Sequence, residues 1–404
     1  LLYSAFTYYT GFKVDSGEYK VMGLAPYGKP RFFDREMVGN TYDLRRNGIT
    51  KPVETWLTRC REMATSFGYD LSPLGDVERV LEPFCVDIAA STQKLFEETI
   101  LSAVEAVSGM FTLAGMPMDT LCYSGGTALN CPTNSRLFAE SPFQTIHITP
   151  HCDDSGLSLG AAQYLYHNVL DKPRREQSPK TIKEFPYLGF LYGEEVVESA
   201  LDAVREKIHV QRLPDAARQA AQDLHDNKII AWFEGRSEIG PRALGHRSLL
   251  ANPKHADNWE RMNQLKCREK WRPFAPAVLE EDANSYFRGH PDESPYMLYT
   301  AQVCTTDLPA ITHVDGSSRI QTVTAETGGL FEVLKYFKGL AGYAVVLNTS
   351  FNVRGEPIVN TPEDAYLCFM RTHMDALAIG PFFLLKDHQP SLDLPSASEA
   401  FGLD

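Results

Sequence analysis

The segment from Lys266 to Leu279 places basic side chains directly before an apolar run that contains two prolines. Its four cations alternate over seven residues: Lys266, Arg268, Lys270 and Arg272. Lysine and arginine neutralise phosphate and carboxylate groups without any proton transfer. The segment therefore indicates either an anion-binding site or a solvated basic face of a helix.

A second set of arginines occurs in EGRSEIGPRALGHRS, where Arg236, Arg242 and Arg247 stand among glycines and a proline. Rigid turns can hold guanidinium groups in the planar, two-pronged arrangement that suits phosphate and carboxylate groups. A solvated charged loop is the alternative for this segment taken alone.

Two further segments add polar side chains to this pattern. In HVDGSSRIQT the polar residues share one parity and could lie on one face of a strand; they are His313, Asp315, Arg319 and Gln321. The run LNTSFNVRGEPI ends a β-pattern with short hydrogen-bonding residues; they are Asn348, Thr349, Ser350 and Asn352. Several such groups in one region of an acidic chain predict a convergent anion pocket.

A glycine pair earlier in the chain could admit a nucleotide. In SGGTALN, Gly125 and Gly126 follow an apolar strand, and Asn130 comes just before a helical pattern. Paired glycines permit close approach to the main chain, a helix N-terminus favours anions, and an asparagine can bind a sugar or base. A plain tight turn explains the same residues equally well.

Acidic residues occur in two similar settings. In DDSGLSLGAA, Asp153 and Asp154 stand where a strand gives way to a helix, so a carboxylate could ligate a metal or cap the helix. In SGEYKVMGLAPYG, Glu18 and Lys20 could contact a nucleotide or form a surface ion pair.

The elements around these motifs alternate between strand and helix. Helical periodicity over 87–107 is followed by two strand–turn–helix units, which contain SGGTALN and DDSGLSLGAA. Later we predict a helix over 214–226, strands at KIIAWFEG and YAVVLNTSF, and a helix that Thr361 caps. This order predicts an α/β fold with ligands at the carboxyl ends of strands.

Composition limits the partners. With 39 basic and 52 acidic residues the net charge is −13, which argues against nucleic acid and anionic membranes. The eight cysteines show no CxxC pair, so we expect reduced thiols in a cytoplasmic protein. No apolar run reaches the ~18 residues typical of a membrane span. The chain begins without Met or a signal peptide, and we expect it to be the back portion of a longer protein.

Together these motifs resemble the O-carbamoyltransferase family, which includes nodulation and antibiotic-tailoring carbamoyltransferases. The resemblance rests on SGEYKVMGLAPYG, SGGTALN, DDSGLSLGAA, GRSEIGPRALGHRS, KCREKWRPFAP, HVDGSSRIQTV and NTSFNVRGEPIV, in family order over nearly the whole chain. It implies a mixed α/β chain in which a partial actin/Hsp70-like ATPase domain precedes a YrdC-like domain. The boundaries it implies are 1–175 for the first domain, 176–189 for a linker, 190–390 for the second domain and 391–404 for a flexible tail.

The resemblance also implies a reaction. The YrdC-like domain would join carbamoyl phosphate to ATP and give carbamoyl-adenylate. The other domain would then transfer the carbamoyl group to a hydroxyl of a small molecule or sugar and release AMP. The implied partners are thus carbamoyl phosphate, ATP and a small-molecule acceptor, without nucleic acid or membrane, and a homodimer stays open.

Site residues follow from the same resemblance, and no catalytic base is assigned. The residues implied for carbamoyl phosphate and the adenylate are Lys266, Arg268, Arg319, Ser350 and Asn352, with Arg242, Arg247 and Arg272 as weaker candidates. Those implied for ATP or adenosine are Glu18, Lys20, Gly125, Gly126 and Asn130. Asp154 is the implied ligand of a divalent metal such as iron or magnesium, with Asp153 as second choice. Lys270 is expected to be solvated, and RPFAP to fix the strand that carries the cations.

One departure from the family concerns the metal. The family's site also uses a histidine pair from an HxxxH segment earlier in the protein, and no such segment is present at that place here. The HxxxH spacing of HITPH, His147 to His151, contains a proline and is interpreted as a strand end instead of a metal pair. The chain is therefore expected to be a fragment or to have an incomplete transfer site. The alternatives are a threonylcarbamoyl-adenylate type of tRNA-modifying enzyme and a truncated, non-catalytic nucleotide-binding module.

Overall fold

This computed structural model describes residues 2–35, 58, 62, 65–66, 80–174, 186–204, 208–391, 394–395 and 397–401. The chain forms two compact units. The first contains 1–123, 130–147 and 313–316, and the second contains 124–129, 148–312 and 317–404. Most of the expected linker and part of the expected tail lie outside the described residues. The domain boundaries at 175 and 190 therefore stay a prediction.

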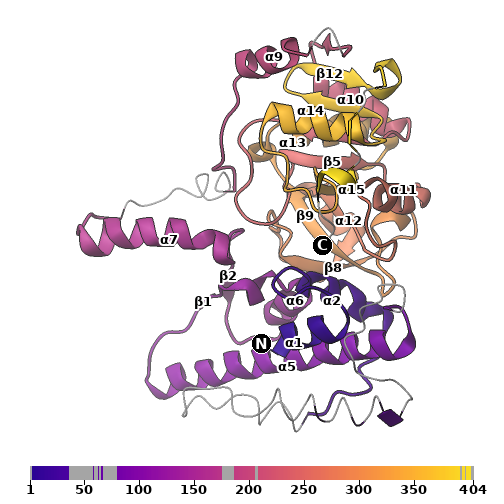
Figure 1. The fold of residues 1–404 in the computed structure, drawn as a ribbon. Helices are drawn as coiled ribbons and strands as arrows, with labels where there is room; N and C mark the ends of the chain where they lie inside the picture. Colours follow the sequence, from indigo (N-terminus) through magenta and orange to yellow (C-terminus); the bar gives the residue numbers. More distant parts are fainter. Residues whose placement is uncertain are drawn as a thin grey trace. The chain divides into compact units, whose positions relative to one another are not determined.

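The first unit is built on one long helix, α5 (Pro83–Leu113). It begins where Pro83 occupies the first turn, a position that needs no N–H donor. The helix predicted over 87–107 is thus confirmed and extends at both ends. Three shorter helices pack along it (Figure 1): α1 (Leu2–Tyr9), α2 (Glu18–Leu24) and α6 (Cys131–Glu140).

Both predicted strand–turn–helix units are present. The strands β1 (Thr120–Cys122) and β2 (Thr145–His147) pair in parallel, from Thr120 with Thr145 to Cys122 with His147. β1 leads through the short helix η4 (Gly126–Leu129) into α6. β2 leads through η5 (Asp154–Gly156) into α7 (Leu157–Tyr164) and η6 (Leu165–Val169). The two units follow the expected chain order.

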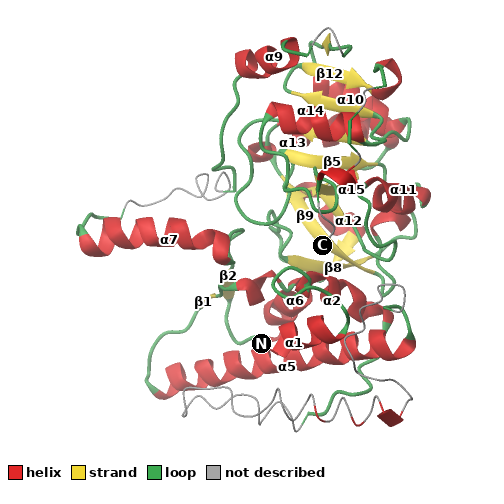
Figure 2. Ribbon diagram, viewed as in Figure 1, coloured by secondary structure: helices red, strands yellow, loops and turns green. Residues whose placement is uncertain are grey.

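A mixed sheet of ten strands forms the second unit among the described residues (Figure 2), in the order β3-β12-β11-β4-β5-β10-β6-β9-β8-β7. The strands are β3 (Gln211–Arg212), β4 (Ile230–Phe233), β5 (Arg247–Ala251), β6 (Ala275–Leu279), β7 (Phe287–Arg288), β8 (Tyr299–Val303), β9 (Ser317–Val323), β10 (Val345–Ser350), β11 (Ala376–Ile379) and β12 (Phe382–Leu385). The pairs β4–β11 and β6–β9 are parallel, and the other pairs are antiparallel. The α/β class predicted from the sequence is confirmed.

Besides η4, η5, α7 and η6, the second unit contains further helices and helical turns. They are α9 (Glu194–Asp202), α10 (Ala216–His225), α11 (Asp257–Leu265), η8 (Glu280–Asp282), α12 (Ala283–Tyr286), η9 (Pro309–Ile311), η10 (Ala325–Thr327), α13 (Gly329–Ala341), α14 (Pro362–Arg371), η11 (Lys386–His388) and α15 (Ala397–Ala400). The helices expected near 214–226 and after Thr361 are α10 and α14. Thr361 and Asp364 form a complete capping box on α14, so the predicted start of that helix is confirmed.

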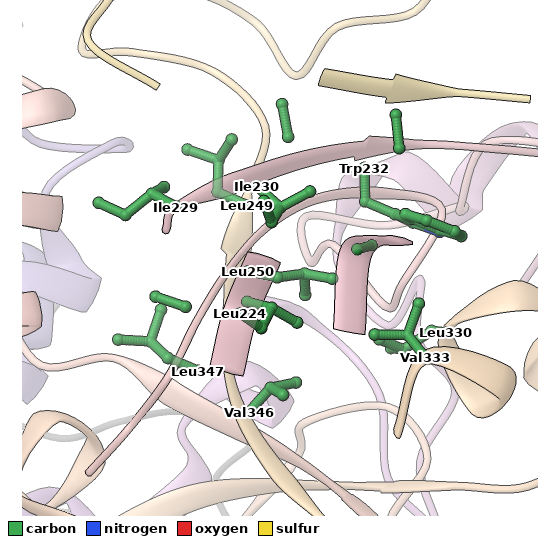
Figure 3. Packing of buried hydrophobic residues seen from close by; sticks show 14 of the residues in the cluster. Leu224, Ile229, Ile230, Trp232, Leu249, Leu250, Leu330, Val333, Val346 and Leu347 are labelled. Atoms are coloured by element: carbon green, nitrogen blue, oxygen red, sulfur yellow. The ribbon is translucent and has the colours of Figure 1, made fainter. Parts of the chain in front are cut away.

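The core of the second unit lies where α10 and α13 cover the sheet. Figure 3 shows Leu224 of α10 and Leu330 and Val333 of α13 packed with strand residues such as Leu250 and Val346. All five side chains are fully buried. Burial of each large apolar side chain contributes about 1.5–3 kcal/mol, so this contact holds the strands in register. No described helix is both long and apolar enough to cross a membrane.

Candidate functional site

One face of the large sheet changes from apolar to polar along β10. Asn348 pairs with Ala275 of β6, and Ala277 pairs with Gln321 of β9, so all four side chains lie on one face. Ser350 lies two residues further along the same face of β10, and Arg319 two residues earlier on β9. Because the β6 residues between them are alanines, the longer side chains of Asn348 and Gln321 can meet above β6. The predicted residues Ser350 and Arg319 thus share one face of the sheet.

Lys266 stands at the end of β10, although it belongs to another element. It is the C-cap residue of α11, and only 4% of it is exposed. Its Nζ donates to the carbonyl oxygens of Ser350 at 2.5 Å and Asn352 at 2.9 Å. It also lies 3.2 Å from Ser350 Oγ and 2.9 Å from Asn352 Oδ1. The structure brings these three predicted residues together.

Burial holds the pKa of Lys266 well below its ordinary value, and the nearby charge of Arg268 lowers it further. The four oxygens around Nζ replace its water shell, but none of them belongs to a carboxylate. The Glu356 charge partly opposes this lowering of the pKa. Binding of an anion beside Lys266 stays a prediction.

The turn after β10 is held from both sides. Asn352 Nδ2 donates to the Glu356 carbonyl at 2.7 Å, and Ser350 Oγ donates to Asn352 Oδ1 at 2.7 Å. The Glu356 carboxylate accepts from the Val353 amide and from Cys368 Sγ, both at 3.0 Å. Burial, followed by the Glu356 charge, raises the pKa of Cys368 well above its ordinary value. These bonds fix the positions of Ser350 and Asn352.

The other three cations of the basic segment differ in setting. Arg268 is half-buried, donates from Nε to Asn263 Oδ1 at 2.7 Å and stacks on Phe274 with its guanidinium carbon 4.2 Å from the ring centre. Arg272 lies 3.6 Å from Glu269. Lys270 is largely exposed and pairs with Glu260 at 2.9 Å. Lys270 is therefore on the surface, as expected.

Two local expectations were wrong. The cations do not lie on a strand, because α11 ends at Leu265 and β6 begins only at Ala275. His313 and Asp315 do not share a strand face with Arg319, because β9 begins at Ser317. Instead, the turn 313–316 belongs to the first unit, where His313 Nε2 lies 2.9 Å from the Gly23 carbonyl. Burial of His313 lowers its pKa.

The arginines of the segment 234–247 have different surroundings. Arg247 is fully buried, and burial lowers its pKa to about 10. Its guanidinium lies 3.6 Å from the Phe233 ring centre and donates to the carbonyls of Glu234 and Gly235. Arg247 therefore holds the backbone at Glu234 and Gly235 in place. Arg242 is half-buried, and its buried Nε has no hydrogen-bond partner among the described residues.

Sequence reasoning missed the contacts of Glu234 and His246, which both belong to this segment. The Glu234 carboxylate accepts from Trp232 Nε1 at 2.9 Å and from the amides of Gly329 and Leu330, at 3.0 and 3.1 Å, which start α13. Burial raises its pKa, and the nearby His246 opposes that rise. No spacing in the sequence predicts this contact, because 95 residues separate Glu234 from Gly329.

His246 was also missed. Its Nδ1 lies 2.7 Å from the Arg236 carbonyl and its Nε2 lies 3.0 Å from the Thr327 carbonyl. Both ring nitrogens therefore face backbone carbonyl oxygens. Tyr187 stacks on the ring with a centroid distance of 3.8 Å. Together these contacts tie segment 234–247 to neighbouring backbone.

The residues expected to bind adenosine in the first unit take part in its framework. Asn130 caps α6 by accepting from the Thr133 amide at 3.1 Å and exchanges hydrogen bonds with Gln93. Glu18 opens α2 and accepts from the Asp15 amide at 3.0 Å. Lys20 is buried, with Nζ 5.5 Å from the Phe12 ring centre. Nucleotide binding by these residues stays a prediction.

The glycine turn and the acidic turn both belong to the second unit. Gly125 has a φ of +97° that disfavours other residues, and its amide donates to the Cys152 carbonyl at 2.7 Å. Gly126 has open space around it. Asp153 caps η5, whereas Asp154 is exposed. The described residues contain no group of three or more His, Cys, Asp or Glu suited to a metal, so the metal stays a prediction.

Two family models match this chain. Residues 1–163 match the model of the carbamoyltransferase N-terminus. Residues 221–386 match the model of the carbamoyltransferase C-terminus. The second match contains the four cations of residues 266–272, the segment 234–247 and the turn after β10.

Three relatives show the range of similarity. The uncharacterized protein sll1178 of Synechocystis sp. is 40% identical over 100% of this chain and 70% of its own length. Nodulation protein NolO of Bradyrhizobium diazoefficiens is 37% identical over 91% of this chain and 66% of its own. The 3'-hydroxymethylcephem-O-carbamoyltransferase of Amycolatopsis lactamdurans is 36% identical over 62% of this chain and 46% of its own.

The chain thus spans between about half and 70% of these relatives' lengths. The two family models fall on most of the described residues and in the family's order. The matches also include relatives that are named as carbamoyl-transferring enzymes. The chain therefore belongs to the carbamoyltransferase family of transferase enzymes.

Proposed function

We propose that this chain is part of an ATP-dependent O-carbamoyltransferase. Its second unit would form carbamoyl-adenylate, and the carbamoyl group would then pass to a hydroxyl of a small molecule or sugar. One observation carries the proposal: a buried lysine without a carboxylate partner meets Ser350 and Asn352 at the polar end of a sheet face that also bears Arg319. The named cephem carbamoyltransferases support a small-molecule acceptor.

The reaction balances with one water molecule. Water breaks the phosphorus–oxygen bond of carbamoyl phosphate and gives carbamate and phosphate. A carbamate oxygen then attacks the α-phosphorus of ATP and pyrophosphate leaves, so carbamoyl-adenylate forms without a protein nucleophile. An acceptor hydroxyl finally attacks the carbamoyl carbon, loses its proton and releases AMP. Such steps depend on positioning and charge stabilisation.

We assign each predicted site residue a role in binding according to its surroundings. Lys266 would neutralise a ligand oxygen beside the turn after β10, and Arg268 and Arg319 would complete the positive wall. Ser350 Oγ and the Asn352 amide would orient the planar carbamoyl group. Arg242 would bind a phosphate oxygen through its guanidinium group. Arg247 would act indirectly, because it donates to the carbonyls of Glu234 and Gly235 and so positions that backbone. The first unit would bind adenosine near Glu18, Lys20 and Asn130.

We expect the chain to release pyrophosphate from ATP only when carbamoyl phosphate is present. The physical reason is that no nucleophile for the α-phosphorus exists until carbamate is generated in the pocket. The measurement is a coupled pyrophosphate assay with and without carbamoyl phosphate. Release that is unchanged without carbamoyl phosphate, or that is stimulated by threonine and bicarbonate instead, would contradict the proposal and favour the tRNA-modifying class.

We expect Arg268→Ala to weaken carbamoyl phosphate binding by at least about 1.5 kcal/mol, the size of one lost charge-assisted hydrogen bond. Lys270→Ala is the matched control, because Lys270 lies two residues away but is exposed and paired with Glu260. Calorimetric titration of both variants measures the two affinities. Equal affinities in the two variants would exclude Arg268 from the pocket.

A further inference from the structure

A chain of amide groups links the polar sheet face to the segment that carries Arg242. Asn348 on β10 and Gln321 on β9 are each 1% exposed. Their side chains meet above β6, with Asn348 Nδ2 2.8 Å from Gln321 Oε1. This contact spans two strand spacings, about 10 Å, and requires small residues on the strand between them. Ala275 and Ala277 satisfy that requirement.

Both amides direct their remaining donors at the same short stretch of backbone. Asn348 Nδ2 also lies 3.4 Å from the Ala243 carbonyl, and Gln321 Nε2 donates to the Leu244 carbonyl at 2.7 Å. Every partner of the two NH₂ groups is an oxygen, so neither amide can be turned over without placing oxygen against oxygen. The orientation of the pair is thus determined.

The N–H groups of the same stretch are held by other side chains. One Glu238 carboxylate oxygen accepts from the amides of Leu244 and His246, at 2.7 and 2.8 Å. Ser248 Oγ accepts from the Gly245 amide at 3.1 Å. The peptide groups directly after Arg242 are therefore fixed by side chains rather than by a strand ladder or helix. Such a stretch can hold a backbone conformation that its own sequence does not favour.

We propose that Gln321 and Asn348 are positioning residues that hold the carbonyls of Leu244 and Ala243 and so aim the Arg242 guanidinium at the bound anion. This inference rests on the proposed function, in which Arg242 contacts carbamoyl phosphate. Arg242 is half-buried and its Nε has no hydrogen-bond partner among the described residues, so we expect the direction of its side chain to depend on the two peptide groups that follow it.

The test compares carbamoyl phosphate affinities of whole-chain variants by calorimetry. Asn348→Leu and Gln321→Met preserve volume but remove the donors, and each is expected to raise Kd about tenfold, as for one lost buried hydrogen bond. Two variants are used because a buried change at one position could prevent folding. Ser318→Ala is the matched control, since Ser318 lies buried on the same strand and donates to the Ile311 carbonyl at 2.6 Å. Its Kd is expected to stay within about twofold of wild type.

A double-mutant cycle separates positioning from general structural damage. Arg242→Ala should raise Kd about tenfold in wild type but less than about twofold in the Asn348→Leu or Gln321→Met background, because Arg242 is already misplaced there. Multiplying effects, or unchanged affinity in both single variants, would overturn the positioning role while leaving the proposed function intact. A wild-type chain that binds no carbamoyl phosphate would overturn the proposed function and this inference with it.

Discussion

Replacing Glu234 with alanine is expected to lower the free energy of unfolding by about 3–5 kcal/mol, because three N–H donors lose their acceptor at a cost of about 1–3 kcal/mol each. The carboxylate accepts from Trp232 Nε1 and from the first two amides of α13, and it lies 4.0 Å from His246. Alanine leaves these donors buried without an acceptor. Urea unfolding, read by circular dichroism, measures the loss.

Two control variants test whether the loss comes from the Glu234 carboxylate: one at the same position and one elsewhere on α13. Glu234→Gln keeps an acceptor oxygen but brings an NH₂ group among donors, so a smaller loss of about 1–3 kcal/mol is expected. Glu332→Ala removes an exposed acid from the first turn of the same helix, 3.6 Å from Lys335, and should cost less than about 1 kcal/mol. A loss in Glu234→Ala no larger than in Glu332→Ala would show that the hydrogen bonds of the Glu234 carboxylate do not stabilise the fold.

Stability is also expected to rise with pH on account of Lys266, with a slope of up to about 1.4 kcal/mol per pH unit. The folded-state pKa of Lys266 lies well below its ordinary value of 10.5. Between these two values the unfolded chain binds more protons than the folded chain, so raising the pH favours folding. Below the folded pKa both states are protonated, and this gain is absent.

The difference between wild type and Lys266→Met isolates this effect. Lys386 has the same sign, since burial lowers its pKa to about 8, but it is present in both proteins and cancels. Buried tyrosines and thiols cancel in the same way. Urea unfolding between pH 7 and pH 10 gives the two curves. Parallel curves would show that Lys266 keeps an ordinary pKa.

Anion binding should reverse the shift of Lys266. A bound phosphate would favour the ammonium form, so binding is expected to take up protons and to weaken as the pH rises. Calorimetric titration of carbamoyl phosphate in two buffers with different ionisation enthalpies measures the uptake. Equal apparent enthalpies in both buffers above the folded pKa would contradict the coupling.

Local patterns were sufficient for the elements themselves. The capping box at Thr361, the apolar run of β10 and the glycine turn at Gly125 each depend on neighbours within a few residues. The ends of strands are harder to predict, because local patterns do not show where strand pairing stops. The assignment of His313 to the strand of Arg319 was wrong because β9 begins only at Ser317. Every second residue lies on one face only within a strand, and that rule no longer holds once the chain turns.

By itself the sequence determined the α/β class, the order of the family motifs and the types of residues able to hold an anion. Only the tertiary structure decided which of them meet. Lys266 reaches Ser350 across 84 residues of chain, and Asn348 reaches Gln321 only because alanines lie on the strand between them. It also separated Arg247, which is fully buried and donates to backbone carbonyls, from Arg242, which is only half-buried. The physical reason is that strand pairing and burial set these distances and charges, and neither is encoded in local spacing.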